Sequence, residues 1–238
     1  MKHVVITGAS SGIGQQLALD YAAEGWQVTA CGRDETRLVA LGAHDPAITT
    51  RHFDITDLSA TRKALAQCPA DLVILCAGTC EYLDNGVVEA ERVARVLNTN
   101  FLGPINCLDA LLPQLLPGSR IALVGSTASL IPMSRAEAYG ASKAALAYFA
   151  RSLSVDLAKY DINVSLILPG FVATPLTDRN DFAMPMIITP KQASHYIRRG
   201  LAKGAAEIAF PPLFAALLRL TALLPQALQR WLAKRLVR

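Results

Sequence analysis

The chain has 238 residues, of which 52% are apolar and 18% charged, so it can bury a large core and is too apolar to be disordered. Its net charge of +4 comes with no basic run in the first two thirds, which argues against a nucleic-acid-binding protein. Five scattered cysteines without a CxxC pair argue against a disulfide framework or a bound metal, and indicate reduced thiols in a cytoplasmic protein.

The first expected secondary-structure element lies at the very start of the sequence. The apolar pattern starts at Lys2, which leaves no room for a secretory leader, and no apolar run is long enough for a membrane-spanning helix. Short β-branched runs then alternate with helix-length segments, so we expect one α/β domain over residues 1–238, with a Rossmann-type doubly wound parallel sheet of about seven strands. Helices are expected to start near residues 12, 35, 58, 89, 137 and 190, and strands to cover 3–7, 27–31, 48–53, 72–76, 120–125, 162–168 and 206–210.

A glycine-rich segment joins the first expected strand to the first helix. It reads Thr-Gly-Ala-Ser-Ser-Gly-Ile-Gly over residues 7–14. Glycines let the backbone turn tightly, and the free N–H groups of a helix start favour an anion such as a pyrophosphate. The alternative is a glycine-rich turn without a ligand, but the order of strand, turn and helix favours a phosphate cradle.

The TGxxxGxG spacing of this segment resembles that of the short-chain dehydrogenase/reductase family. In that family the loop binds the adenosine and pyrophosphate of a nicotinamide dinucleotide. The resemblance implies that the cofactor contacts here are Gly8, Ser10, Ser11, Gly12, Ile13 and Gly14.

The end of the second strand indicates which cofactor is used. NAD-binding folds usually carry an acidic residue there that binds the ribose hydroxyls, whereas this chain has Gly32 followed by Arg33. A guanidinium offers a forked donor to a 2′-phosphate, so we expect NADP(H). The alternative is that Arg33 is a solvated charge and Asp34 caps the next helix.

Two further segments resemble cofactor contacts of the family. Asp54 and Ile55 after the third strand match its adenine-contacting pair, and Ala77 with Gly78 after the fourth matches the end of its NAG motif. Residues 75 and 76, leucine and cysteine, replace the usual asparagines, so the bracing that these amides give the sheet is in doubt.

Four residues match the catalytic set of the family. Tyr139 and Lys143 lie four residues apart at the start of a helix, hence on one face, and we expect the ammonium to lower the pKa of the tyrosine. Ser126, at the end of the fifth strand, would bind the substrate oxygen, with Ser129 as its near competitor. Asn100 matches the asparagine that kinks the fourth helix and holds a water next to the lysine, and Asn98 is the alternative.

The segment after the sixth strand reads Pro-Gly-Phe-Val-Ala-Thr over residues 169–174 and resembles the family's PG motif. There, Val172 backbone groups and the Thr174 hydroxyl would orient the nicotinamide amide. Residues 175–205 are expected to form a substrate lid, although Met184 and Met186 would equally suit the core. His195 is expected to be structural or exposed.

The last segment, residues 211–238, is basic and amphipathic and reads as two helices broken at Pro225. It could lie on an anionic membrane, which would suit a lipid-like substrate, or pack on a second subunit. Family members are usually oligomeric, so we favour subunit packing in a homodimer or homotetramer.

Together these features predict an NADP(H)-dependent oxidoreductase that acts on a carbonyl or alcohol substrate, apolar or lipid-like. A non-catalytic nucleotide sensor or scaffold on the same fold is the alternative, but all four catalytic positions are filled. An epimerase or dehydratase fits less well, because that branch of the superfamily generally has TGxxGxxG and longer chains.

Overall fold

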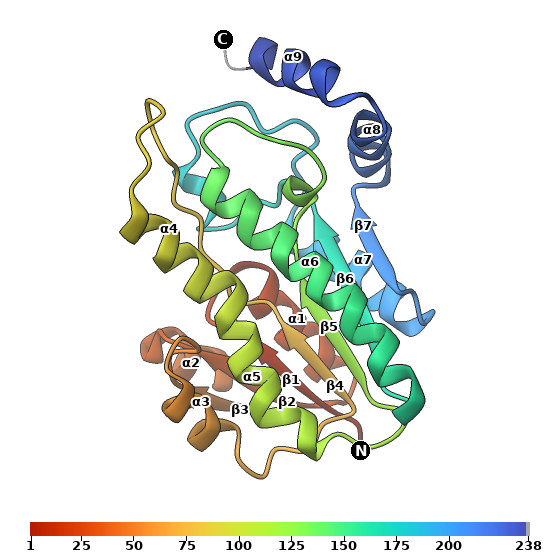
Figure 1. The fold of residues 1–238 in the computed structure, drawn as a ribbon. Coiled ribbons are helices and arrows are strands. Elements are labelled where there is room, and N and C mark those ends of the chain that lie inside the picture. Colours follow the sequence, from red (N-terminus) through yellow and green to blue (C-terminus); the bar gives the residue numbers. More distant parts are fainter. Residues whose placement is uncertain (237–238) are drawn as a thin grey trace.

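A seven-stranded, entirely parallel sheet forms the centre of the molecule (Figure 1). The computed structural model describes residues 1–236. Neighbouring strands follow the order β3-β2-β1-β4-β5-β6-β7, which reverses direction between β1 and β4 and confirms the predicted doubly wound fold. The strands are β1 (His3–Thr7), β2 (Gln27–Gly32), β3 (Ile48–His52), β4 (Leu72–Leu75), β5 (Arg120–Val124), β6 (Asn163–Pro169) and β7 (Glu207–Phe210).

Helices cover both faces of this sheet. Successive strand residues alternate between the faces, so Val4 and Ile6 join one buried cluster and Val5 the other. The first cluster lies under α1 (Gly12–Ala23), α2 (Glu35–Gly42) and α7 (Pro190–Ala202). The second lies under α3 (Leu58–Leu65), α5 (Gly103–Leu111) and α6 (Glu137–Leu157), and α4 (Ala90–Leu97) packs against α6.

The helix between β4 and β5 is interrupted rather than regular. A π-helical turn, Asn98–Leu102, joins α4 to α5 without a loop. On one side of this turn α4 packs against α6, and on the other α5 packs against α3. The helix is therefore interrupted at the place where the kink is predicted, and Asn100 lies in the middle of the π-helical turn.

Two C-terminal helices follow the sheet, α8 (Pro212–Ala222) and α9 (Gln226–Leu236), with the break at Pro225 that the sequence predicts. Both lie at the end of the molecule where the strands finish, the upper end in Figure 1. Within residues 1–236, no helix is long and apolar enough to cross a membrane.

Candidate active site

The carboxyl edge of the sheet brings the predicted cofactor loop against the end of β4. Gly8 has φ +69°, and a Cβ on it would come within 2.8 Å of the Ala77 backbone. Gly12 has φ +56°, and a Cβ there would lie 2.9 Å from Thr174 Cγ2. Side chains at these positions would fill the space in front of the helix start, so glycine keeps open a cradle that suits a pyrophosphate.

A groove of about 280 Å³ runs along this edge. Its lining contains twelve of the predicted cofactor contacts, namely Gly8, Ser10, Ser11, Gly12, Ile13, Gly14, Arg33, Asp54, Ile55, Ala77, Gly78 and Thr174. These residues come from the ends of four strands and the segment after β6. Val172, Asn100, Tyr139 and Lys143 do not line the groove.

Arg33 and Asp54 face each other at the adenosine end of this groove. Arg33 Nη1 lies 3.2 Å from Asp54 Oδ2, and the arginine side chain is 64% exposed. Burial opposes ionisation of Asp54, but hydrogen bonds from Thr56 and from Arg33 prevail and lower the pKa of its carboxyl group. Asp34 caps α2 by accepting from the Arg37 N–H at 3.0 Å, as the alternative interpretation expects of it.

The backbone after β4 is braced by Thr7, the first residue of the glycine-rich segment, which has no role in the sequence-based prediction. The Thr7 hydroxyl accepts hydrogen bonds from the N–H groups of Cys76 and Ala77, at 3.1 and 3.2 Å. These bonds end the β4 ladder at Leu75, one residue earlier than predicted. Burial raises the pKa of the Cys76 thiol to about 11, so the residue at the asparagine position is a neutral, packed side chain.

Asn100 is fully buried in the π-helical turn. Its Oδ1 accepts from the Thr79 N–H at 2.8 Å, and its Nδ2 donates to the Thr79 carbonyl at 2.9 Å and to Ser142 Oγ at 3.0 Å. Asn100 thus fixes the backbone after β4 to α6, the helix that carries Tyr139 and Lys143. Asn98, the alternative, is exposed.

Tyr139 and Lys143 lie together on α6, as their spacing predicts. Lys143 Nζ lies 5.8 Å from the centre of the Tyr139 ring and donates to the Val124 carbonyl at 2.9 Å. A Cβ on Gly78 would lie 3.5 Å from Lys143 Nζ and 3.2 Å from Asn100 Oδ1. The ammonium therefore borders both the end of β4 and the asparagine.

The expected lowering of the tyrosine pKa is not present in this structure. Burial raises the pKa of Tyr139 to about 12, partly offset by a hydrogen bond with Ser126. Burial also lowers the pKa of Lys143 to about 8. The expectation is wrong for the protein alone because burial is the largest influence on the phenol, and because the ammonium is bonded to a carbonyl rather than to the phenol.

Ser126 has the position expected of a substrate-oxygen donor. It follows β5, its side chain is buried, and it lies near enough to Tyr139 to lower the pKa of the phenol. Its Oγ also accepts from the Ala128 N–H at 3.1 Å. Ser129 Oγ instead donates to the Ser126 carbonyl at 2.7 Å, so it stabilises the turn after β5.

The segment after β6 closes the site from the other side. Val172 is buried, forms a β-bridge with Ile188, and its carbonyl accepts from Thr177 Oγ1 at 2.7 Å. Thr174 lies against the glycine loop, as the contact with Gly12 shows. Residues 190–202 of the expected lid form α7, which is packed on α1, so only residues 175–189 remain as a covering segment. His195 is exposed.

Side-chain pairs hold together the loops on the substrate side. Arg135 bonds Asp84 before α4 and Asp181 in the covering segment, both at 2.6 Å, and its guanidinium lies 5.0 Å from the ring centre of Tyr82. The Tyr82 hydroxyl donates to Asn180 Oδ1 at 2.5 Å. Three segments that are distant in sequence are thus fastened to one another.

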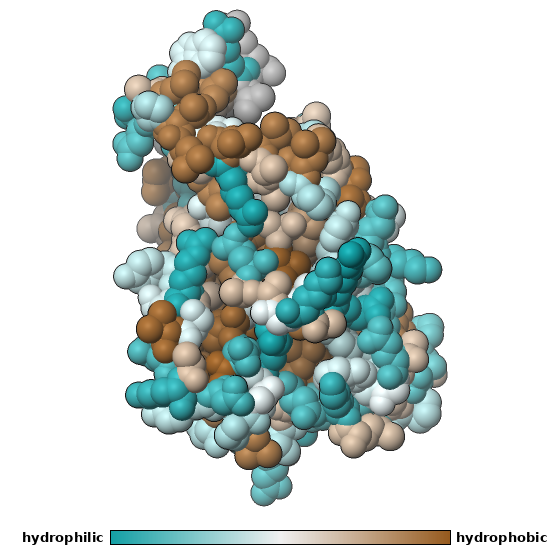
Figure 2. Space-filling model, turned by 90° about the vertical axis from the view of Figure 1, so that its right-hand side faces the viewer, coloured by the Kyte–Doolittle hydropathy of each residue, from teal (hydrophilic) through white to brown (hydrophobic). Residues whose placement is uncertain are grey.

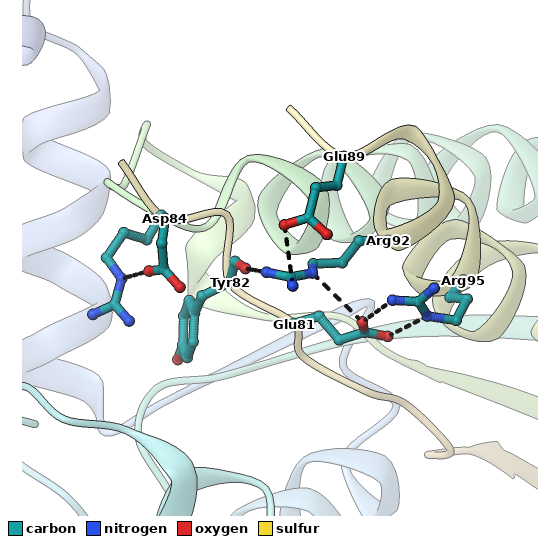
Figure 3. A network of polar contacts seen from close by, with 7 residues as sticks. Glu81, Tyr82, Asp84, Glu89, Arg92 and Arg95 are labelled. Carbon is teal, nitrogen blue, oxygen red and sulfur yellow. Dashed lines mark hydrogen bonds and ion pairs between the residues drawn. The ribbon is translucent and has the colours of Figure 1, made fainter. Parts of the chain in front are cut away.

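Figure 3 shows how the loop before α4 is fixed to that helix. Arg95 forms a two-point contact with Glu81, at 2.8 and 3.3 Å. Arg92 donates to the Tyr82 carbonyl at 2.6 Å and pairs with Glu89 at 3.1 Å. Sequence reasoning missed this network, because no motif relates charged residues in separate loops.

An aromatic row continues from this network toward α8. Ring centres of Tyr82 and Phe182 are 5.8 Å apart, those of Phe182 and Phe171 6.1 Å, and those of Phe171 and Phe214 5.7 Å. Burial, Cys80 and the neighbouring Tyr139 raise the pKa of Tyr82, so this end of the row lies near Tyr139.

Comparisons with known proteins agree with this arrangement. The sequence model of the short chain dehydrogenase family matches residues 2–183. An uncharacterized oxidoreductase of Myxococcus xanthus is 36% identical, over 98% of this chain and 96% of its own length. Serine 3-dehydrogenase of Agrobacterium fabrum is 37% identical, with 73% of each chain covered.

Two more distant similarities bear on cofactor and fold. The NADPH-dependent 1-acyldihydroxyacetone phosphate reductase of Schizosaccharomyces pombe is 31% identical, over 84% of this chain and 70% of its own length. The crystal structure of a dehydrogenase/reductase from Sinorhizobium meliloti superposes with a TM-score of 0.77 at 24% identity, covering 87% of this chain and 92% of the other. At that identity the likeness concerns the fold alone.

Proposed function

The chain belongs to the short-chain dehydrogenase family of oxidoreductases, and we propose that it transfers a hydride between NADP(H) and a carbonyl or alcohol group. The observation that carries the proposal is the placement of two hydroxyl groups, those of Ser126 and Tyr139, with Lys143 beside the phenol ring, at the sheet edge that carries the groove. When bound, the nicotinamide supplies the hydride that a carbonyl carbon accepts.

In the direction of reduction, Tyr139 donates the proton and Ser126 holds the oxygen. The carbonyl carbon gains the hydride and its oxygen gains the tyrosine proton, so a ketone or aldehyde becomes an alcohol while NADPH becomes NADP⁺. A pKa of about 12 keeps the phenol protonated at neutral pH, as a proton donor must be. Buried Lys143, bonded to the Val124 carbonyl, places positive charge where a phenolate forms after transfer.

The preference for NADP(H) rests on Arg33 and Gly32. No carboxylate occupies the end of β2 to bind ribose hydroxyls, and the exposed guanidinium can turn from Asp54 to a 2′-phosphate. The Asp34 carboxylate is engaged with Arg37, at 3.2 Å between Oδ2 and Nε, which lessens its repulsion of a phosphate. The name of the Schizosaccharomyces pombe relative, an NADPH-dependent enzyme, supports the same choice.

We propose an apolar substrate, because the rings of Phe171, Phe182 and Phe214 continue from Tyr82 as an apolar row on this side of the site. Serine 3-dehydrogenase is named for a polar amino acid, so relatives of similar identity do not share one substrate class. The proposal therefore rests on the side chains of this protein.

NADPH fluorescence titration followed by a panel of ketones and aldehydes tests the function. We expect tight NADPH binding, oxidation of NADPH with part of the panel, and a loss of about 10³-fold in kcat for Tyr139→Phe with unchanged NADPH binding. Tyr148→Phe is the matched control, because Tyr148 is on the same helix and 76% exposed. Binding without turnover across the panel would favour a nucleotide sensor.

The remaining features of the proposal concern assembly and location. We propose one catalytic domain over the whole chain, with residues 175–189 as the lid, in a cytoplasmic homodimer or homotetramer. The exposed apolar side chains Leu102, Tyr148 and Val155 on the α5–α6 side suit contact with a second subunit. Sedimentation velocity of the parent and of a Tyr148→Glu, Val155→Glu variant tests this face.

A further inference from the structure

Only one side of the C-terminal arm, defined here as residues 211–235, is attached to the body. Phe214 of α8 lies against Gly170, where a Cβ would come within 2.8 Å of its ring, and Ala215 beside it is buried. The Phe214 ring also contacts Phe171. Because Gly170 has no side chain, the Phe214 ring can pack against it and hold α8 next to the end of β6.

The other side of α8 presents leucines to the outside. Leu213, Leu217 and Leu220 follow the i, i+4, i+7 spacing of one helix face and are 62%, 48% and 62% exposed. Leu223 at the end of the helix is 82% exposed. In α9, Leu228 and Trp231 are also exposed large apolar residues. The arm thus carries an apolar surface that the described part of the chain does not cover.

This surface continues around the end of the molecule that carries the active site. Exposed apolar residues also occur in the loop before α4, at Val87 and Val88, and in the covering segment, at Phe182, Met186 and Ile187. Both segments lie at the same end as α8 and α9 in Figure 1, and Figure 2 shows hydrophobic residues gathered there. The apolar surface and the carboxyl edge of the sheet therefore face the same way.

The positive charge of the arm indicates which kind of partner binds its apolar surface. Residues 211–238 contain five basic and no acidic residues, so residues 1–210 have a net charge of −1 although the whole chain has +4. Arg230, Lys234 and Arg235 are exposed, and the Arg235 guanidinium lies 4.3 Å from the Trp231 ring centre. Two copies paired arm to arm would bring like charges together, which opposes such a dimer.

We propose that the C-terminal arm binds the surface of an anionic lipid bilayer. The α8 leucines and Trp231 enter the boundary between headgroups and acyl chains, where tryptophan is favoured because its ring is apolar and its N–H is polar. Arg230, Lys234 and Arg235 contact lipid phosphates and carboxylates, and their aliphatic stems cover part of the apolar face.

One consequence rests on the proposed function. If the arm lies on a bilayer, the aromatic row from Phe214 to Tyr82 connects the membrane side of the molecule with Tyr139. Substrates that partition into lipid, such as long-chain ketones or aldehydes, would then reach the hydroxyl pair without crossing water.

Vesicle flotation of the full-length protein tests the binding. We expect flotation with phosphatidylcholine vesicles that contain about 30% phosphatidylserine, and none with phosphatidylcholine alone, at low ionic strength. The triple variant Arg230→Gln, Lys234→Gln, Arg235→Gln should reduce partitioning into these vesicles about 100-fold. Each basic residue near an anionic surface strengthens binding about fivefold, and the three factors multiply. Leu217→Asn with Leu220→Asn should also reduce it.

A matched triple variant separates local charge from total charge. Lys159→Gln, Arg199→Gln and Lys203→Gln remove three exposed basic residues at the opposite edge of the sheet and should leave flotation unchanged. Absence of flotation by the parent, or equal losses in both triple variants, would overturn the proposal. So would arm leucine variants that dissociate an oligomer in sedimentation velocity while flotation persists, because a second copy then covers the arm.

The binding test is independent of turnover. Flotation of Tyr139→Phe should equal that of the parent, so failure of the proposed chemistry leaves this result intact. If both proposals hold, the triple arm variant should raise the KM for a long-chain ketone in anionic vesicles and leave that for a short water-soluble ketone unchanged. Equal effects on both ketones would contradict entry from the bilayer.

Discussion

The two sides of the active site are built in different ways. On the side proposed to bind the cofactor, the backbone shapes the groove, which is formed by glycines at positive φ, a helix start and strand ends. On the substrate side, side chains from separate loops are fastened to one another, mainly through Arg135 and the arginines of α4. Backbone geometry tolerates little change, whereas exposed ion pairs contribute little individually. Substitutions should therefore have unequal effects on the two sides.

The largest effect is expected at Gly8. Gly8→Ala adds a Cβ that collides with the Ala77 backbone, so the loop must move, and we expect NADPH to bind about 100-fold more weakly. Gly25→Ala is the matched control, because Gly25 also has positive φ (+81°) but open space around it. That variant should lose about 1 kcal/mol of stability and keep its NADPH affinity, as measured by thermal unfolding and fluorescence titration.

Arg33 is the exception on the cofactor side, because its side chain rather than the backbone is expected to determine the preference for NADPH over NADH. Arg33→Ala should weaken NADPH binding about 10- to 100-fold, the loss expected for charge-assisted hydrogen bonds to a phosphate, and leave NADH binding nearly unchanged. Isothermal titration with both nucleotides measures this. Equal losses for the two would contradict the phosphate role.

Lys143 lies where the two sides meet and predicts a pH dependence. Because burial lowers its pKa to about 8, kcat/KM for reduction should fall above pH 8, by about tenfold per pH unit, as the ammonium loses its proton. Lys143→Arg, which keeps its charge, should shift this fall to higher pH. A profile that does not change in Lys143→Arg would assign the ionisation to another group.

Over the pH range in which kcat/KM falls, the contribution of Lys143 to stability should instead rise. Between about pH 8 and the ordinary lysine pKa of 10.5, the unfolded chain binds this proton more tightly than the folded protein does. The contribution of Lys143 to the free energy of unfolding therefore rises with pH there. Thermal unfolding alongside the rate measurements would distinguish loss of the proton from loss of the fold.

The smallest effect is expected at Arg135. Arg135→Gln removes two partly exposed ion pairs, and such pairs contribute little individually, so KM should rise roughly two- to tenfold with kcat nearly unchanged. Arg62→Gln, which removes the distant surface pair with Asp109, should leave KM unchanged. A loss in kcat larger than that in KM would show that Arg135 does more than hold the loops.

The same contrast explains what the sequence could predict. The alternation of strands and helices, the glycine loop and the interruption of the helix at Asn100 follow from local patterns and from family motifs of fixed spacing. The Arg135 contacts could not be predicted, because they join residues 84, 135 and 181, which no periodicity relates. The pKa of Tyr139 was predicted in the wrong direction, because spacing reveals a neighbouring charge but not the burial of both groups.

The π-helical turn at Asn98–Leu102 has a consequence for how this protein can vary. A π turn holds about one residue more than the α-helical turn that it replaces, and one residue corresponds to about 100° of rotation about the helix axis. Deleting a single residue there would restore a regular helix. The lost rotation would then turn either the packing face of α4 away from α6 or the Asn100 side chain away from Thr79. Chain length in this segment is thus constrained as tightly as residue identity, and an insertion or deletion should be more harmful there than most substitutions.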